Sequence, residues 1–236
     1  MKLFIPILLL LFTLSSCKKT VIDDDEIIST HVLTKEQQEK LTPDEVIEDL
    51  KQGNKDFVED NLTIRNTTQR VREAALGQYP EAVVLSCLDS RVPVEDVFHK
   101  AIGEIFVARV AGNIVNDDIL GSLEYACKVS GSKVIVVLGH EYCGAIKSSI
   151  EGVKLGHITS LLQKIEPAIE LAKTHYHGEA SAKNPDFVDE VCEFNVLNSI
   201  KVIRAESSIL KDMEAQGQIK IIGGVYDMKT GEVTFI

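Results

Sequence analysis

Two short runs of apolar, β-branched residues constrain the fold of this chain more than any other feature. They span residues 82–86 (AVVLS) and 134–139 (VIVVLG), and polar residues follow each run at once. Runs of this length and composition are typical of strands that are buried on both faces of a parallel sheet. Ligands bind at the carboxyl ends of the strands in an open α/β sheet, so we expect the residues after both runs to meet at one site.

The residues that follow the two runs are suited to binding zinc. Cys87 follows the first run, and His140 and Cys143 follow the second. Two thiolates and one imidazole hold zinc in catalytic sites whose fourth position stays open. We expect Gly139 to let the chain turn sharply out of the strand. A helix is then expected to begin near Cys143, where its positive end would stabilise a thiolate.

An acidic and a basic residue accompany the first cysteine. On an extended backbone, side chains two residues apart share a face, so Cys87, Asp89 and Arg91 are expected to lie on one side. Arg91 can hold the Asp89 carboxylate by charge-assisted hydrogen bonds, which decides whether that carboxylate reaches the metal or leaves room for water. The alternative is a structural ion pair that only stiffens the loop.

The order of the motifs resembles that of a known family. C-x-D-S-R occupies residues 87–91, R-V-A-G-N occupies 109–113, and H-x-x-C-G occupies 140–144. This combination is similar to the β-class carbonic anhydrases, and the resemblance extends from residue 41 to residue 236. A single H-x-x-C motif would carry almost no information, whereas the three motifs in this order are specific.

The resemblance implies a reaction and a role for each motif residue. The reaction is the reversible hydration of CO₂ to bicarbonate and a proton, with zinc held by three ligands: Cys87, His140 and Cys143. Asp89 would orient the attacking water, and Arg91 would keep Asp89 away from the metal. Bound zinc supplies the activation of that water.

The resemblance is less informative about substrate binding and assembly. Some members of the family bind substrate through a glutamine after the cysteine motif, whereas this chain has Lys100-Ala101 there. Substrate orientation is therefore assigned to backbone N–H groups near Gly144. An inhibitory bicarbonate site built on tryptophan cannot be present, because the chain has no tryptophan. The N-terminal helices are implied to wrap a partner subunit in a homodimer or a higher homo-oligomer.

Strand and helix patterns alternate along the chain, and this alternation predicts an α/β fold. The predicted architecture is a mostly parallel β-sheet flanked by helices on both faces, with a C-terminal antiparallel edge strand. Further strands are expected at residues 104–110, 219–225 and 232–236. One helix is expected to begin at Thr42, and others are expected over 66–76, 118–129 and 141–150. Residues 157–173 are expected to be helical with a break at Pro167. A long helix is expected to begin at 184 and to end before 216.

Charge and cysteine content restrict the class of protein. The formal net charge of the whole chain is −11, which argues against nucleic-acid binding because phosphate contacts need lysine and arginine. The spacing of the five cysteines does not suggest a disulfide framework. Cys127 and Cys192 are expected to pack as small apolar residues.

The N-terminus predicts export and lipid attachment. Residues 1–16 combine a basic start with a short apolar run, as in a secretory signal peptide. Residues 14–17 (LSSC) resemble a bacterial lipobox, in which Cys17 would become the lipidated first residue. Residues 17–34 are then the lipidated cysteine and an acidic tether, and residues 35–236 are the β-carbonic anhydrase domain. The protein is expected at the cell envelope. The alternative is an ordinary signal peptide with a chance cysteine.

Other functions compete with CO₂ hydration. The same zinc site could hydrolyse CS₂ or COS, which pocket shape would decide. A non-catalytic module could bind zinc with Asp89 always in the fourth position. A disulfide between Cys87 and Cys143 would leave His140 and the Asp89–Arg91 pair without a role. Among the other histidines, His99, His157 and the tract at 175–177 are expected on the surface or in packing, with a proton-shuttle role open only for His99 and His157.

Overall fold

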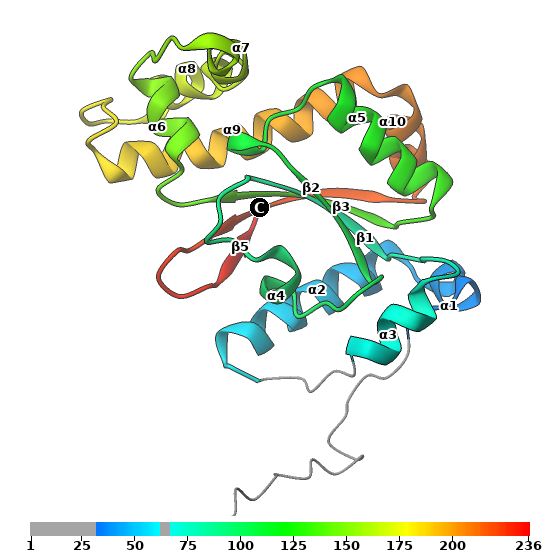
Figure 1. The fold of residues 1–236 in the computed structure, drawn as a ribbon. Coiled ribbons are helices and arrows are strands. Elements are labelled where there is room, and N and C mark those ends of the chain that lie inside the picture. Colours follow the sequence, from blue (N-terminus) through cyan, green and yellow to red (C-terminus); the bar gives the residue numbers. More distant parts are fainter. Residues whose placement is uncertain (1–31, 62–66) are drawn as a thin grey trace, which may run out of the picture.

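The computed structural model describes residues 32–61 and 67–236, and a five-stranded sheet forms its centre (Figure 1). The strands are β1 (Ala82–Ser86), β2 (Ile105–Arg109), β3 (Val134–His140), β4 (Lys220–Tyr226) and β5 (Val233–Phe235). Their order is β2-β1-β3-β4-β5; the first four are parallel, and β5 pairs with β4 in the antiparallel sense. The predicted fold class is therefore confirmed.

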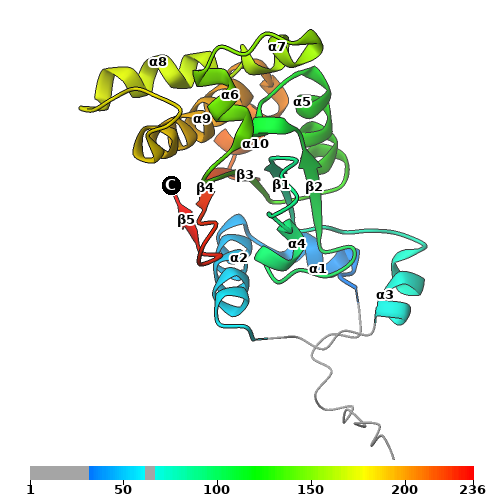
Figure 2. The same ribbon diagram turned by 60° about the vertical axis from the view of Figure 1, so that its left-hand side comes forward.

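Helices cover both faces of the sheet (Figures 1 and 2). One face carries α2 (Pro43–Val58) and α4 (Val94–Val97), with α1 (Lys35–Lys40) on the same side and α3 (Thr67–Ala74) farther from the sheet. The other carries α5 (Asp117–Glu124), the π-helix Tyr125–Val129, α9 (Pro185–Glu206) and α10 (Ser208–Ala215). Three more helices, α6 (Gly144–Ile150), α7 (Gly156–Leu162) and α8 (Glu166–His175), lie over one end of α9.

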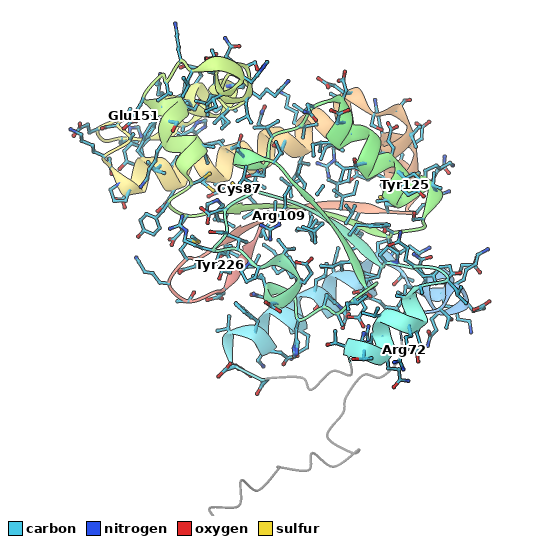
Figure 3. The ribbon with its side chains drawn as sticks, in the orientation of Figure 1. Arg72, Cys87, Arg109, Tyr125, Glu151 and Tyr226 are labelled. Atoms are coloured by element: carbon cyan, nitrogen blue, oxygen red, sulfur yellow. The ribbon has the colours of Figure 1, made fainter. Side chains whose placement is uncertain are left out.

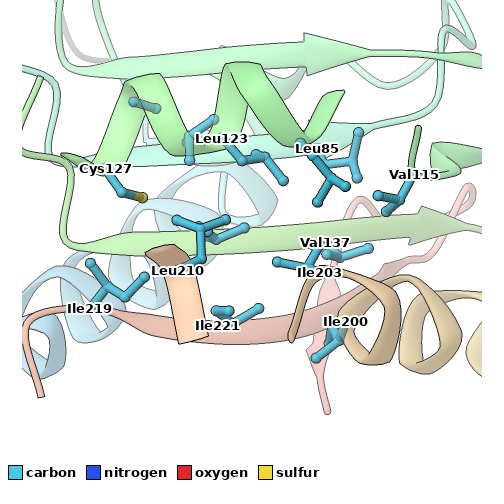
Figure 4. Close-up of a cluster of buried hydrophobic side chains, with 14 of the residues drawn as sticks. Leu85, Val115, Leu123, Cys127, Val137, Ile200, Ile203, Leu210, Ile219 and Ile221 are labelled. Atoms are coloured by element: carbon cyan, nitrogen blue, oxygen red, sulfur yellow. The ribbon is translucent and has the colours of Figure 1, made fainter. Parts of the chain in front are cut away.

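The alternation of side chains along β1 divides the core into two layers. Val83 and Leu85 point into the cluster formed with α5, α9 and α10 (Figure 4). Ala82 and Val84 point into the cluster formed with α2 and α4. All of these side chains are almost fully buried, which is why the strand sequence is continuously apolar rather than alternating.

Helix α2 begins where its capping residues predict. The Thr42 hydroxyl accepts a hydrogen bond from the Glu45 N–H while the Glu45 carboxylate accepts one from the Thr42 N–H, and Pro43 occupies the first turn. Val46 and Leu50 are buried on the stripe that faces the sheet. The short helix α1, capped in the same way by Thr34, was not predicted.

The sheet order explains where a site can form. From β1 the chain crosses to β2 on one side, whereas from β3 it continues to β4 on the other side. The connections that leave the carboxyl ends of β1 and β3 therefore diverge, and they leave a crevice between these neighbouring strands. Cys87 and His140 lie at this crevice.

Three expected helices differ from the observed ones. The helix predicted over 141–150 begins only at Gly144. The helix predicted over 118–129 is α-helical only to Glu124, and its last turn is the π-helix. The long helix predicted from 184 is interrupted at Ser207. The Ser207 hydroxyl accepts a hydrogen bond from the Leu210 N–H, so α10 begins as a new helix.

The prediction that Gly139 lets the chain turn out of the strand was wrong. Gly139 lies within β3, and a Cβ there would come within 2.7 Å of Val196 and 2.9 Å of the Cys192 sulfur, so the glycine permits close packing of α9 on the strand. The predicted division of residues 157–173 into two helices is confirmed, since α7 ends at Leu162 and Pro167 lies in the first turn of α8. No helix in the described residues is long and apolar enough to span a membrane.

Candidate metal centre

Cys87, His140 and Cys143 come together at the crevice. One ligand atom from each residue lies within 4.8 Å of those of the other two. Cys87 is 5% exposed, and the other two are 1% exposed. Cys87 follows β1, His140 is the last residue of β3, and Cys143 precedes the first turn of α6. In the described part of the chain this is the one cluster of such residues with the spacing of a metal site.

The hydrogen bonds of His140 prepare its ring for a metal. Nδ1 lies 2.8 Å from the Glu141 carbonyl oxygen, which can only accept, so Nδ1 carries the proton. Nε2 is then the unprotonated nitrogen, and it is buried without a hydrogen-bond partner among the described residues. A buried lone pair of this kind costs free energy unless an ion binds it, so the three residues fit zinc.

The two sulfurs influence each other's ionisation. A hydrogen bond from Cys143, together with one from the Gly112 N–H, lowers the pKa of Cys87 to about 4 against the effect of burial. The same contact with Cys87, reinforced by burial, raises the pKa of Cys143. One thiolate is therefore ready at neutral pH, and a divalent cation supplies the charge that favours the second.

Asp89 and Arg91 form a bidentate pair beside the three ligands. Arg91 Nε lies 2.9 Å from Asp89 Oδ1, and Arg91 Nη2 lies 2.7 Å from Oδ2. Asp89 Oδ2 is 3.9 Å from His140 Nε2. The segment is a turn and not the extended backbone we expected, and the Arg91 N–H also donates to Asp89. Hydrogen bonding from Arg91 holds the pKa of Asp89 at about 2.

Arg109, to which the sequence analysis gave no role of its own, holds the main chain of this turn. Its guanidinium donates to the carbonyl oxygens of Cys87 and Asp89, each at 3.2 Å, and to that of Val92. Cys87 and Arg109 lie close together near the middle of the molecule (Figure 3). The side chain therefore shapes the loop that carries the first ligand and the Asp89–Arg91 pair.

The other residues that the sequence singled out lie beside the cluster, in the core or away from the site. Gly144 begins α6 next to Cys143, and a Cβ there would meet nothing within 4 Å, so its backbone borders open space. Cys192 donates to the His140 carbonyl at 3.2 Å, and Cys127 lies in the core, so both are buried as expected. His175 packs against Phe194 and lies outside the metal cluster.

Comparisons with known proteins agree with this geometry. A family model described as "Carbonic anhydrase" matches residues 82–233, which include all three candidate ligands. Carbonic anhydrase 2 of Mycobacterium tuberculosis is 31% identical over 190 residues, which cover 77% of this chain and 87% of that protein. The carbonic anhydrase of Pseudomonas aeruginosa is 31% identical over 175 residues, covering 70% and 77% of the two chains.

A solved structure extends the match to three dimensions. The β-carbonic anhydrase of Coccomyxa, determined in complex with acetazolamide, is 31% identical with a TM-score of 0.64, and the match covers 72% of this chain and 78% of that one. This chain belongs to the β-carbonic anhydrase family.

Membership in the β-carbonic anhydrase family confirms the resemblance and identifies the metal that the cluster suits. β-carbonic anhydrases use zinc, and two sulfurs with one imidazole are a zinc ligand set. The sequence motifs led to Cys87, His140 and Cys143. They did not indicate Asn195 and Ser199, polar residues on the apolar face of α9 that bond to the R-V-A-G-N segment.

Proposed function

We propose that this chain catalyses the zinc-dependent, reversible hydration of CO₂ to bicarbonate and a proton. The observation that carries the proposal is the buried group of Cys87, His140 and Cys143 with a bidentate Asp89–Arg91 pair at its edge. Relatives named carbonic anhydrase, which match most of the chain, support the same reaction.

The three ligands would hold zinc through two thiolates and the His140 Nε2 atom. Zinc bound there would supply Lewis-acid chemistry, which lowers the pKa of a water molecule toward neutral pH. The Glu141 carbonyl keeps the proton of His140 on Nδ1, and the buried surroundings exclude bulk water from the sulfurs.

Asp89 would orient the attacking water and accept its hydrogen bond. With a pKa of about 2, Asp89 is a carboxylate at physiological pH and acts only as an acceptor. Arg91 occupies both oxygens on one side, which leaves their remaining lone pairs for water. Because Arg91 is 55% exposed, the pair lies where the buried site meets solvent, and a proton can leave there.

This arrangement favours an enzyme over a module in which zinc is only structural. Such a module needs Asp89 as a permanent fourth ligand, whereas the Asp89 oxygens are bonded to Arg91 and lie outside the metal cluster. Gly144, at the start of α6, offers backbone N–H groups next to Cys143 for orienting the substrate.

Stopped-flow measurement of CO₂ hydration on protein of known zinc content tests the proposal. We expect hydration that scales with zinc occupancy and is lost with chelation. Zinc-loaded protein that does not exceed the uncatalysed rate would refute the proposal. Hydrolysis of CS₂ or COS by that same preparation would instead support the alternative hydrolase.

The N-terminus and the assembly extend the proposal. Residues 1–16 would direct export, Cys17 would carry lipid, residues 17–34 would tether the domain at residues 35–236, and the protein would lie at the cell envelope. All but three residues of the leader and tether fall outside the described residues. The domain would form a homodimer or a higher homo-oligomer; the half-exposed strand β2, at the edge of the sheet, is available for such a contact.

A further inference from the structure

We propose that Asn195, assisted by Ser199 one turn later on α9, is a positioning residue of the zinc site. The proposal takes zinc as the ion held by Cys87 and so rests on the proposed function. Asn195 Nδ2 donates to the Gly112 carbonyl oxygen at 2.8 Å. The Gly112 N–H in turn lies 3.3 Å from Cys87 Sγ and donates to it. Gly112 thus links α9 to a metal ligand.

The segment that α9 holds is a strained turn. Gly112 has φ of 70° and Asn113 has φ of 40°, both in the left-handed region, which a non-glycine residue such as Asn113 enters only at a cost. Ser199 Oγ donates to the Asn113 carbonyl at 3.1 Å, so α9 binds two successive carbonyl groups of the turn. Residues four apart lie on one helix face, which allows both bonds at once.

Packing holds the position of the turn but not the orientation of its peptides. A Cβ at Gly112 would come within 2.8 Å of Ile165 and 3.2 Å of Ala145, so side chains from two neighbouring segments already press on the glycine. A peptide group can still rotate in place, and glycine has the broadest choice of backbone angles. The Asn195 bond to the Gly112 carbonyl oxygen, together with the bond from the Asn113 N–H to the Val110 carbonyl oxygen at 3.0 Å, fixes the peptide between Gly112 and Asn113. The Gly112 N–H belongs to the preceding peptide, so Asn195 acts on it through the Gly112 Cα, by holding the residue from which that N–H faces the sulfur.

An N–H donor directed at a thiolate matters for the metal. Groups that bond to metal ligands orient them, and their loss typically weakens metal binding by about 10–100-fold. Asn195 is 1% exposed and Ser199 is 2% exposed, so no water from bulk solvent can take over either bond. A polar pair placed on the apolar face of a central helix is costly unless it has such a task.

The test is the zinc affinity of Asn195→Ala. Competition with a chromophoric chelator gives the dissociation constant for zinc, and we expect it to rise about 10–100-fold. Ser199→Ala, which leaves Asn195 in place, is expected to weaken binding in the same direction but less. The matched control is Asn198→Ala, an asparagine of the same helix with no side-chain hydrogen bond to the turn; its zinc affinity is expected to stay at the wild-type value.

Two further readouts separate positioning from simple stabilisation. In cobalt-substituted protein, the thiolate-to-metal absorption is expected to change in Asn195→Ala and to stay unchanged in Asn198→Ala. The melting temperature is measured with zinc and with chelator. An Asn195→Ala protein that melts equally earlier in both conditions, with wild-type zinc affinity and cobalt spectrum, would overturn the proposal. If Asn195→Ala does not fold, wild-type affinity in Ser199→Ala overturns it.

Failure of the role of Asn195 and failure of the proposed catalysis give different experimental results. Wild-type protein that binds zinc but does not hydrate CO₂ would refute the proposed function, and the affinity loss in Asn195→Ala would still stand. Wild-type protein that hydrates CO₂, with unchanged zinc affinity in Asn195→Ala, would refute only the role of Asn195.

Discussion

Individual atoms decide the chemistry of this site. His140 can offer Nε2 to a metal because the Glu141 carbonyl occupies Nδ1, and Asp89 stays beside the cluster because Arg91 bonds to both of its oxygens. The same residue types without these bonds would bind a metal differently. We expect substitutions that move one bond to act on the site and to spare the fold.

Cys143→Ser is expected to lose most of the zinc and all CO₂ hydration. A serine hydroxyl stays protonated at neutral pH and replaces a soft thiolate that zinc binds well. Metal analysis after dialysis checks the loss, with Cys127→Ala, in the core away from the cluster, as the control that keeps its zinc. Full zinc occupancy in Cys143→Ser would contradict the ligand assignment.

Arg91→Lys is expected to lower kcat/KM for CO₂ hydration by roughly tenfold or more, while zinc content stays unchanged. Lysine is a point charge and cannot make the parallel Nε and Nη2 bonds to Asp89, so the carboxylate is free to turn toward the metal. Arg72→Lys, an exposed change on α3, is the control. Unchanged kinetics in Arg91→Lys would show that Arg91 only stiffens the turn.

The elements bring these atoms together because of their order in the sheet. Diverging connections after β1 and β3 open the crevice, and α9 crosses both the strand β3 and the turn at Gly112. The close approach of α9 to β3 depends on Gly139, since Val196 and Cys192 occupy the space above it. Changes at the contact between α9 and β3 are therefore expected to affect the stability of the fold.

Gly139→Ala is expected to lower the free energy of unfolding by about 1–3 kcal/mol, because the added methyl group overpacks the contact between β3 and α9. The matched change Gly121→Ala, in α5, meets nothing within 4 Å in this chain and is expected to raise that free energy by about 0.5–1 kcal/mol. Urea denaturation measures the free energy of unfolding of both variants. Equal effects of the two changes would show that α9 does not pack on Gly139 as described.

At the scale of the whole molecule, a buried ionic group ties α2 to the sheet. Glu81, directly before β1, lies 2.6 Å from Lys100, which also pairs with Asp49 of α2. Glu81 and Lys100 are 7% and 8% exposed. Burial raises the pKa of Glu81 from 4.5 to about 7 even though Lys100 opposes the shift.

This shift predicts how stability depends on pH. The folded chain binds the Glu81 proton more tightly than the unfolded chain does, so stability from this group is present at low pH and is lost as pH rises from 4.5 to about 7. Glu81→Gln cannot ionise, and its stability is expected to fall less than that of the wild type between pH 5 and pH 8. Urea denaturation with saturating zinc compares the two, with exposed Glu206→Gln as control. Parallel pH profiles would contradict the prediction.

Cys17→Ala tests the predicted attachment of the whole molecule. Without the thiol no lipid can be added, and the short apolar run at residues 3–14 is not long enough to anchor the protein by itself. Expressed in a lipoprotein-processing bacterium, the variant is expected in the soluble fraction, whereas Cys87→Ala is expected to stay with the membranes. Membrane association that survives Cys17→Ala would refute the lipobox.

The sequence alone determined the strands, the candidate ligands and the family, because these depend on short patterns. Continuous apolar runs predicted β1 and β3, and the residues directly after them supplied Cys87, His140 and Cys143. The capping pattern at Thr42 located the start of α2 for the same reason. Each of these signals lies within a few residues of what it predicts.

Only the tertiary structure decided which distant residues support the site. Asn195 and Gly112 are 83 positions apart, and Arg109 lies 22 positions from Cys87, so no local pattern connects them. Gly139 was assigned to a turn because the sequence does not show which α9 residues lie next to it. Close packing of these α9 residues on the strand is the reason for a glycine at this position, and a turn is not. Propensity describes a residue by itself, whereas the role of a buried polar or small residue is set by the partner that packing brings to it.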